Sequence, residues 1–218
     1  MFIRDAKAIA ERLVTRMEPF CRRVQIAGSI RRGRQEVKDI EIVAVPEWGE
    51  SSLGLFLDGG EKINKLLQWA FDDESFGDLT WIKPGTQEVI PWAPKRDGKY
   101  WRALLREGIK LDLFLTTEEQ WGLIYLIRTG SAEFSQGVMT YVKHQTYYRI
   151  KDGTLLDGEG EVLPTPEEDE VFRLLRLDYV EPGGRCGFAA VKKGGRDVFP
   201  SGYVVGAMAA RGLREMKE

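Results

Sequence analysis

Apolar residues recur at helical spacing in several parts of the chain. Between residues 9 and 20 they fall on one face, which predicts a first helix that Asp5 caps and Pro19 ends. The same spacing predicts a helix over residues 62–71 and further helical segments from residue 118 to residue 144. The chain therefore has predicted helices near its N-terminus and in its second half, and the region between them has a different pattern.

That middle has the shorter period of β-strands. Strands are predicted over residues 23–27 and 39–45, with a glycine- and serine-rich loop from residue 48 to residue 60. Between residues 78 and 115, apolar segments alternate with turns, and the last two form a hairpin around a short turn that contains glycine. These apolar segments cover residues 79–84, 87–92, 100–105 and 109–115.

The order of the elements favours an α+β protein with two regions. Residues 1–116 form a mixed, β-rich unit, and residues 117–182 form a mainly helical unit. Within the second unit, Thr165-Pro166-Glu167-Glu168 combines a capping box with proline at the first helical position, which predicts the start of a helix. Glycine, lysine and arginine are frequent from residue 183 onward, and we expect residues 183–218 to be an appendage.

Composition limits the classes of protein to which the chain can belong. Of the 218 residues, 43% are hydrophobic, which is enough for a core, so a disordered chain is excluded. The 32 basic and 34 acidic residues give a net charge of −2, which excludes a protein held on nucleic acid by charge alone. No apolar run is long enough for a membrane helix, and Cys21 and Cys186 lack zinc or redox spacing. We therefore expect a soluble protein of the cytoplasm, or of the host cytoplasm if the source is a virus.

A glycine–serine turn directly follows the first predicted strand. The segment Gly28-Ser29-Ile30-Arg31-Arg32-Gly33 can point its backbone N–H groups outward together at the start of a helical turn. The Ser29 hydroxyl and the forked guanidinium of Arg31 or Arg32 add further donors. The segment is therefore a candidate phosphate site, although such turns are more often ordinary loops.

Three acidic residues lie on the strands predicted after this turn. Strand alternation puts Asp39 and Glu41 on one face, where two carboxylates can hold hard cations such as Mg²⁺, although such a face is usually only solvated. Asp112 interrupts an apolar strand and needs a metal or a basic partner, for which Lys110 and Arg102 are the simple alternatives. If the two strands are neighbours, the three acids meet beside the phosphate turn. That arrangement suits two-metal phosphoryl or nucleotidyl transfer.

The combination of these motifs resembles the family X DNA polymerases, which belong to the nucleotidyltransferase superfamily. The resemblance covers roughly residues 4–182 and implies a nucleotidyltransferase palm, with a mixed β-sheet flanked by helices, followed by a small, mainly helical subdomain. It also implies a compact form without the amino-terminal lyase domain of larger relatives. The motifs that carry the resemblance are Gly28-Ser29-x-Arg31-Arg32-Gly33, Asp39-x-Glu41, Leu111-Asp112-Leu113 and Thr129-Gly130-Ser131.

The resemblance also implies a role for each motif residue. Asp39, Glu41 and Asp112 would be the catalytic acids and would hold two Mg²⁺ ions, or Mn²⁺, while Asp112 would help to deprotonate the primer 3′-hydroxyl. Ser29 and Arg32 would bind the β- and γ-phosphates of the nucleotide. The other nucleotide contacts that it implies are Gly28, the backbone around Lys38, and the turn Thr129-Gly130 beside the sugar.

The sequence departs from the pattern of this family at several positions. Glu41 replaces the usual aspartate, and Lys110 replaces the arginine that normally pairs with the third acid. Ile127 and Arg128 stand where relatives have an aromatic pair, which implies relaxed selection of the sugar. The positions where relatives often have asparagine and arginine, facing the base and the template, are Ser135 and Met139.

The resemblance implies a polymerase that extends a primer 3′ end on gapped or nicked DNA, using nucleoside triphosphates. We expect a monomer that fills short gaps and holds DNA only loosely. Two alternatives stay open: a nucleotidyltransferase with an RNA, protein or small-molecule acceptor, and a nucleic-acid-binding relative that has lost catalysis.

Overall fold

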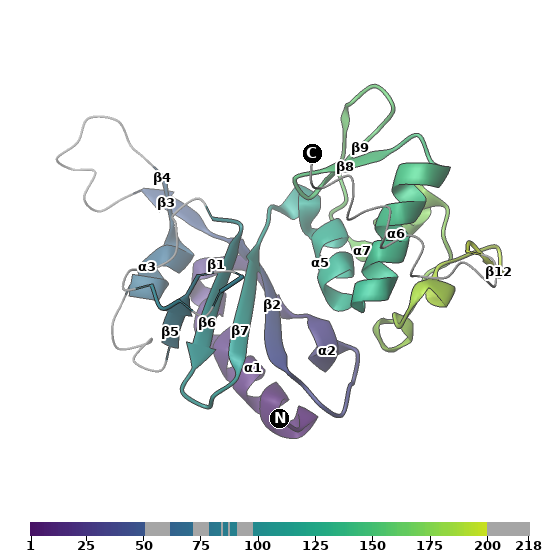
Figure 1. Cartoon of the computed structure of the whole chain (residues 1–218). Coiled ribbons are helices and arrows are strands. Elements are labelled where there is room, and N and C mark those ends of the chain that lie inside the picture. The colour runs from purple at the N-terminus through teal and green to yellow at the C-terminus, as the bar shows by residue number, and fades with distance from the viewer. Residues whose placement is uncertain (51–61, 72–78, 84, 87, 91–97, 200–218) are drawn as a thin grey trace.

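The computed structural model describes residues 1–50, 62–71, 79–83, 85–86, 88–90 and 98–199. Figure 1 shows two lobes side by side, one built around a twisted sheet and one built mainly from helices. The chain passes from the first lobe to the second after strand β7. Among the described residues, no helix combines the length and the apolar character that a membrane span needs.

The first helix begins earlier than its polar residues predict. Helix α1 (Ile3–Met17) has Phe2 at its N-cap, without a side-chain cap, and Asp5 lies in its first turn. The prediction that Asp5 caps the helix is therefore wrong, because the backbone carbonyl of Phe2 already accepts from the first turn. Pro19 does end α1, since it lies in the short 3₁₀ turn Glu18–Phe20 that follows.

The sheet of the first lobe has five strands of mixed direction. Strand β2 pairs in parallel with β7, while the other neighbouring pairs are antiparallel. This mixed sheet, with helices against it, confirms the α+β fold that the sequence predicts. In spatial order the strands are β1 (Cys21–Ile26), β2 (Asp39–Pro46), β7 (Lys110–Leu115), β6 (Tyr100–Leu105) and β5 (Leu79–Ile82).

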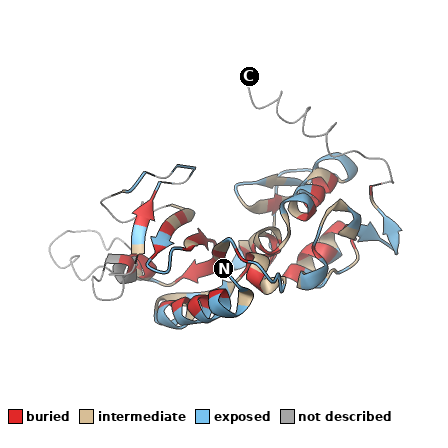
Figure 2. Cartoon of the chain, turned by 60° about the horizontal axis from the view of Figure 1, so that its bottom comes forward, coloured by how far each residue is buried: buried red, intermediate tan, exposed pale blue. Residues whose placement is uncertain are grey.

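The two faces of this sheet differ in chemistry. One face packs on α1 through the first core, which includes the fully buried Ile40 and Leu111. Figure 2 shows the helix beside the N-terminus with buried positions toward the sheet and exposed positions outside. On the other face, Val43 and Phe114 pack against helix α5 (Trp121–Thr129) of the second lobe. Alternation therefore turns positions 39, 41 and 112 toward the second lobe.

A small two-stranded ribbon in the first lobe shows that two predicted boundaries were wrong, the start of a loop and the start of a helix. Strand β3 (Trp48–Glu50), expected as the start of a loop, pairs antiparallel with β4 (Lys62–Asn64), expected as the start of a helix. The helix α3 (Lys65–Phe71) begins only after Asn64, whose side-chain oxygen accepts from the N–H of Leu66. The rest of the predicted loop, residues 51–60, lies outside the described residues.

The predicted hairpin is confirmed, whereas half of the strand predicted over residues 87–92 lies outside the described residues. Strands β6 and β7 pair antiparallel around a turn in which Gly108 has a positive φ of 77°. Of residues 87–92, only 88–90 are described, and they contribute a single bridge between Ile82 and Val89.

The second lobe is mainly helical and also contains a small sheet that the sequence did not predict. Its strands are short, from two to three residues, and form an antiparallel ribbon with weak period-2 patterning. Along the chain the lobe comprises the 3₁₀ turn Glu118–Gln120, α5, α6 (Ala132–Gln145), β8 (Arg149–Lys151), β9 (Thr154–Leu156), β10 (Val162–Leu163) and α7 (Glu168–Leu175).

The predicted capping box before α7 does not form. The N-cap is Glu167, with no side-chain cap, and Pro166 precedes it. The Thr165 hydroxyl donates instead to the carbonyl oxygen of Glu119, 3.2 Å away, so a contact with another segment replaces the local one. Glu168, expected as the second half of the box, points toward other partners described below.

The segment from residue 183 packs on the second lobe as far as the structure describes it. Val191 and Phe199 are buried in the core of this lobe, and Arg185 has no exposed surface. The division of the chain at residue 182 stays a prediction. The short elements of this segment are Pro182–Gly184, Phe188–Ala190, β11 (Lys192–Lys193) and β12 (Arg196–Asp197).

Candidate active site

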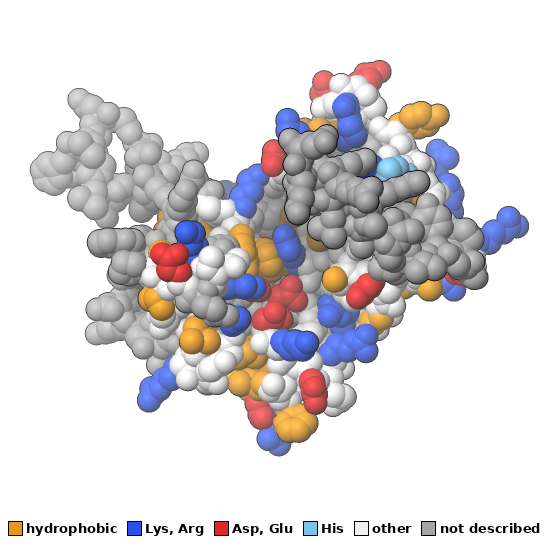
Figure 3. Space-filling model, viewed as in Figure 1, with side chains coloured by type: hydrophobic (Ala, Val, Ile, Leu, Met, Phe, Trp, Pro, Cys, Tyr) orange, Lys and Arg blue, Asp and Glu red, His pale blue; other side chains and the backbone are white. Residues whose placement is uncertain are grey.

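Three carboxylates lie together on the face of the sheet that is turned toward the second lobe. The parallel pairing of β2 with β7 puts Glu41 opposite Asp112, and Asp39 lies two residues before Glu41 on the same face. The two strands are therefore neighbours, as the sequence analysis required for the acids to meet. Figure 3 shows acidic side chains in a hollow between the lobes, with lysine and arginine side chains at its border.

Burial, and then mutual repulsion, disfavours the charged forms of two of these acids. Burial, followed by repulsion from Asp39, raises the pKa of Glu41 from 4.5 to about 7. Burial, followed by repulsion from Asp112, also raises the pKa of Asp39. A cluster of carboxylate oxygens with uncompensated negative charge is suited to hard divalent cations. We call Asp39, Glu41 and Asp112 the acid cluster.

Asp112 is held by basic and polar neighbours on the adjacent strand. The Arg102 guanidinium donates from Nε to Oδ1 at 2.5 Å and from Nη2 to Oδ2 at 2.6 Å, and the Tyr100 hydroxyl donates to Oδ1 at 2.8 Å. Of the two simple partners that the sequence offered, Arg102 is the one in contact, and Lys110 is not the partner. Both oxygens of Asp112 are therefore engaged. Among the described residues, no three acidic, histidine or cysteine side chains are arranged around one metal position.

The glycine–serine segment lies directly against the acid cluster. It forms the short helix α2 (Gly28–Arg31) where a turn was expected. Gly28 has a φ of +61°, and a Cβ atom there would lie 1.9 Å from Oε2 of Glu41. Only glycine fits both the left-handed conformation and this close approach. The side chain of Glu41 therefore occupies the space that a side chain at position 28 would need.

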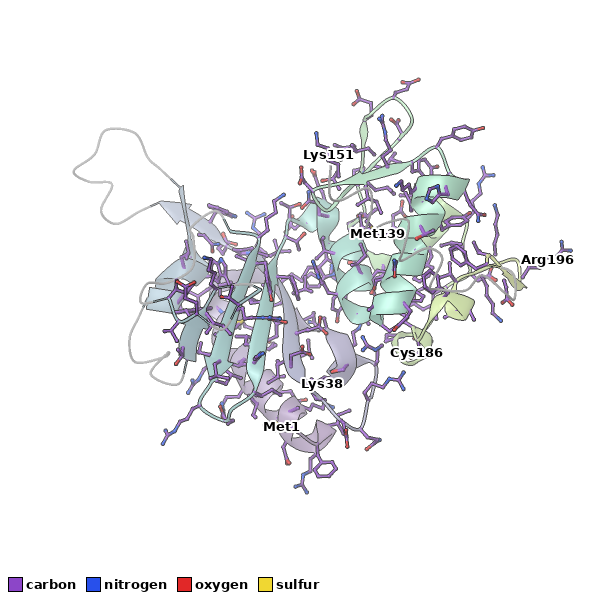
Figure 4. All side chains as sticks on the ribbon, viewed as in Figure 1. Met1, Lys38, Met139, Lys151, Cys186 and Arg196 are labelled. Carbon is purple, nitrogen blue, oxygen red and sulfur yellow. The ribbon has the colours of Figure 1, made fainter. Side chains whose placement is uncertain are left out.

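Residues from both lobes meet at Arg32. Its Nη1 donates to the backbone carbonyl oxygens of Thr129 and of Gly130, the latter at 2.9 Å. The Ser29 hydroxyl and Arg32 Nε are buried and have no hydrogen-bond partner within the described part of the chain. The structure thus brings Ser29, Arg32, Thr129 and Gly130 together. Lys38 is exposed at the start of β2, and Figure 4 labels it.

A second group of charged side chains joins the lobes, and sequence reasoning missed it. Glu168 accepts two hydrogen bonds from Arg31, at 2.8 and 2.6 Å, and further ones from the fully buried Arg185, the nearest at 2.5 Å. Burial alone would raise the pKa of Glu168, but the hydrogen bonds from Arg31 and Arg185 keep it below its usual value. Arg31 also donates to the Thr129 hydroxyl at 2.7 Å. We call Arg31, Glu168 and Arg185 the interlobe triad.

Two of the departures from the family pattern lie beside the site. Arg128 stacks its guanidinium on the ring of Phe114, 3.9 Å from the centroid, and Ser135 donates to the carbonyl oxygen of Ile127 at 2.7 Å. Met139 is 38% exposed on α6, where Figure 4 labels it.

The contact between Arg102 and Asp112 could have been predicted from the sequence, since a three-residue turn over residues 106–108 puts position 102 opposite position 112.

A mixed sheet with acids beside a Gly–Ser helix start, followed by a helical lobe, is the arrangement of a polymerase beta-like nucleotidyltransferase fold. Residues 124–186 match the family described as DNA polymerase beta thumb. DNA polymerase lambda of Rattus norvegicus is 27% identical over 169 residues, which cover 72% of this chain and 28% of that protein. DNA nucleotidylexotransferase of Gallus gallus is 35% identical over 88 residues, 40% of this chain and 16% of that protein. The human enzyme of the same name is 32% identical over 91 residues, 41% of this chain and 17% of that protein.

These matches confirm the resemblance that the motifs predicted, and the chain is related to the family X DNA polymerases. The chain spans less than a third of the length of these curated relatives. Residues 124–186 account for most of the second lobe, so the similarity to the thumb family falls on this lobe.

Proposed function

We propose that the chain is a DNA nucleotidyltransferase that adds nucleotides to a primer 3′-hydroxyl. It would use two divalent cations, fill short gaps in DNA and select weakly between deoxyribose and ribose. The observation that carries the proposal is the register of β2 and β7, which sets Glu41 opposite Asp112 and against the backbone of Gly28.

The acid cluster fits Mg²⁺ or Mn²⁺ on the chemistry of its atoms. All its donors are carboxylate oxygens, which these ions prefer, and the raised pKa values of Asp39 and Glu41 reflect negative charge that a cation would relieve. Asp39 and Glu41 would hold the ion beside the triphosphate. Asp112 would join them with one oxygen once Arg102 gives up one of its two hydrogen bonds.

Polar atoms without partners support a triphosphate position beside the acids. Buried polar groups are normally hydrogen-bonded, so the Ser29 hydroxyl and Arg32 Nε indicate an absent acceptor. We propose that Ser29 donates to the β- or γ-phosphate. Arg32 would exchange the carbonyl oxygens of Thr129 and Gly130 for phosphate oxygens, which bind a guanidinium more strongly because they are charged.

In the proposed reaction, the primer 3′-oxygen attacks the α-phosphorus, the new O–P bond forms, and the bond to pyrophosphate breaks. Bound divalent cations supply charge neutralisation and lower the pKa of the attacking hydroxyl. Asp112 orients this hydroxyl and receives its proton, while Arg102 and Tyr100 fix the orientation of Asp112. Ser29 and Arg32 hold the leaving pyrophosphate, and the turn at Thr129-Gly130 lies beside the sugar.

The alternatives have less support. An enzyme with an RNA, protein or small-molecule acceptor has no need of a thumb, yet residues 124–186 match one. A binding module without catalysis has no need of three adjacent carboxylates, two of which, Asp39 and Glu41, have pKa values raised by burial and then by repulsion from a neighbouring acid. Neither alternative accounts for the thumb and the acids together.

The test is nucleotide incorporation on gapped, nicked, blunt and single-stranded DNA, with deoxynucleotides and ribonucleotides in parallel. We expect extension that requires Mg²⁺ or Mn²⁺ and is greatest on short gaps. The variant Asp112→Ala should lose extension while its circular dichroism spectrum stays unchanged. Full extension by Asp112→Ala would contradict the proposed site, and a preference for single-stranded ends would replace gap filling by addition without a template.

A further inference from the structure

Arg128 places a positive charge beside the acid cluster from the opposite lobe. It lies at the end of α5, and its guanidinium stacks on Phe114 with 3.9 Å to the ring centroid. Phe114 follows Asp112 by two residues on β7, so both side chains lie on the same face of the sheet. Phe114 also stacks on Tyr100, the residue that donates to Asp112, with ring centroids 4.9 Å apart.

Within the described part of the chain, Arg128 forms no short ion pair. The side chain is half-buried, and its Nε atom is buried without a hydrogen-bond partner among the described residues. Burial lowers the pKa of Arg128, and the attraction of Glu41 is the strongest influence that opposes this shift. The guanidinium is therefore poorly solvated, and its principal electrostatic partner is a member of the acid cluster.

The other arginines at the site are committed to contacts of their own. Arg102 is bound to Asp112 through two hydrogen bonds, and Arg32 is bound to the backbone at Thr129 and Gly130. Among the described residues, no hydrogen bond or ion pair reaches the carboxylate of Glu41, and the positive charges that act on it are Arg32 and then Arg128. Of these two, Arg128 is the one not held by hydrogen bonds to another group in the described part of the chain.

We propose that Arg128 is a positioning residue that compensates the charge of Glu41 and Asp112 while no divalent cation is bound, and that it thereby weakens cation binding. The inference rests on the proposed function, because it takes the acid cluster as the cation site. It concerns a property of this chain, in which arginine stands where the family pattern has an aromatic residue.

The structure also provides space into which Arg128 can move when a cation arrives. A small cavity of about 180 Å³ is lined by Arg128 itself and by residues that include Lys99, Phe114, Gln120 and Asp152. A stacked guanidinium can slide over an aromatic ring at little cost, because the contact is not directional in the plane of the ring.

The test compares two variants that both lose the guanidinium and differ in charge. In Arg128→Gln the positive charge is removed, and in Arg128→Lys it is kept. Mn²⁺ binding to the full chain without nucleotide is measured by calorimetry and by electron paramagnetic resonance. We expect Arg128→Gln to bind Mn²⁺ roughly tenfold more tightly, as removal of a nearby charge at intermediate dielectric implies. Arg128→Lys should bind like the wild type, and so should the remote control Arg4→Ala.

The outcomes separate this inference from the proposed function. Tighter binding in both Arg128 variants would assign the effect to lost stacking and would overturn the charge role. Equal binding in all variants, with nucleotide incorporation intact, would overturn the inference alone. If neither the wild type nor Arg128→Gln bound Mn²⁺, and no nucleotide were incorporated, the proposed function would fail together with it. In the supported case, Arg128→Gln also reaches half-maximal incorporation at a lower Mg²⁺ concentration.

Discussion

Two groups of charged side chains lie between the lobes, and their charge balance is opposite. In the interlobe triad, one carboxylate, Glu168, is held by two arginines, and its pKa is lowered. In the acid cluster, Asp112 is held by Arg102, but Asp39 and Glu41 have no such partner among the described residues, and the pKa of Glu41 rises to about 7. The triad is complete as the chain folds, whereas the acid cluster is incomplete without further cations.

The difference separates buried carboxylates that stabilise the fold from those that bind a ligand. A carboxylate that serves folding finds its partners within the chain, because a buried and unpaired charge destabilises the folded state. A carboxylate that serves binding has no cationic partner within the chain, and a bound ligand then supplies one. Neutralising an acid should therefore cost activity in the acid cluster and stability in the interlobe triad.

The largest effect is expected at Glu41. We predict that Glu41→Gln lowers nucleotide incorporation by roughly 10³-fold at pH 8, because a cation ligand is lost. The free energy of unfolding at pH 8 should not fall, since the substitution removes a charge that burial disfavours. Steady-state incorporation and urea unfolding measure the two quantities. A loss of stability equal to that of a triad variant would break the distinction between the two groups.

The converse substitution lies in the interlobe triad. We predict that Glu168→Gln lowers the free energy of unfolding by about 3 kcal/mol, because the buried Arg185 and Arg31 lose their charged partner. Glu170→Gln is the matched control, since Glu170 pairs with Arg173 at the surface of the same helix and should have little effect. Urea unfolding of both variants gives the comparison, and equal values would contradict a structural role for the triad.

The stability of the protein should depend on pH through Glu41, which has no cationic partner in contact with it among the residues that the structure describes. Glu41 ionises near pH 4.5 when unfolded and near pH 7 when folded. Its contribution to stability is therefore highest below pH 4.5, declines between pH 4.5 and 7, and is fully lost above pH 7. The stability difference between wild type and Glu41→Gln should change across this window. In the wild type, Mg²⁺ should raise the unfolding temperature more at pH 8 than at pH 5.5.

The smallest effect is expected at the edge of the acid cluster, where Ile127 and Arg128 replace an aromatic pair. With less steric restriction there, kcat/KM for ribonucleotides should lie within roughly tenfold of that for deoxynucleotides. Parallel extension assays with the two nucleotide sets measure the ratio. Strong preference for deoxynucleotides would mean that another part of the site selects the sugar.

Much of the acid cluster could be predicted from the sequence, because strand alternation fixes which residues share a face. Asp39 and Glu41 had to lie together, and a polar residue within the apolar strand marked Asp112 as partnered. The parallel pairing of β2 with β7 was only a condition, since no local pattern specifies which distant strands become neighbours. Register in the hairpin offered Arg102, which the sequence analysis treated as one of two alternatives.

The interlobe triad could not be predicted, because its members are distant in sequence and each has an ordinary local explanation. Glu168 fitted a capping box, Arg31 a phosphate turn, and Arg185 a glycine-rich appendage. The capping box failed because Thr165 bonds to Glu119, a contact that only the folded lobe creates. Strand alternation therefore predicted correctly which side chains share a face of the sheet. The capping rule failed because a tertiary contact competed with the local hydrogen bond.

The complete burial of Arg185 has a practical consequence for anyone who shortens the chain. Residue 182 is an attractive place to cut, since the sequence predicts that the helical unit ends there and glycines follow. A fragment ending at that point would lose the guanidinium that neutralises Glu168, together with Val191 and Phe199 from the core. Shortened versions of the protein should therefore extend at least through Phe199.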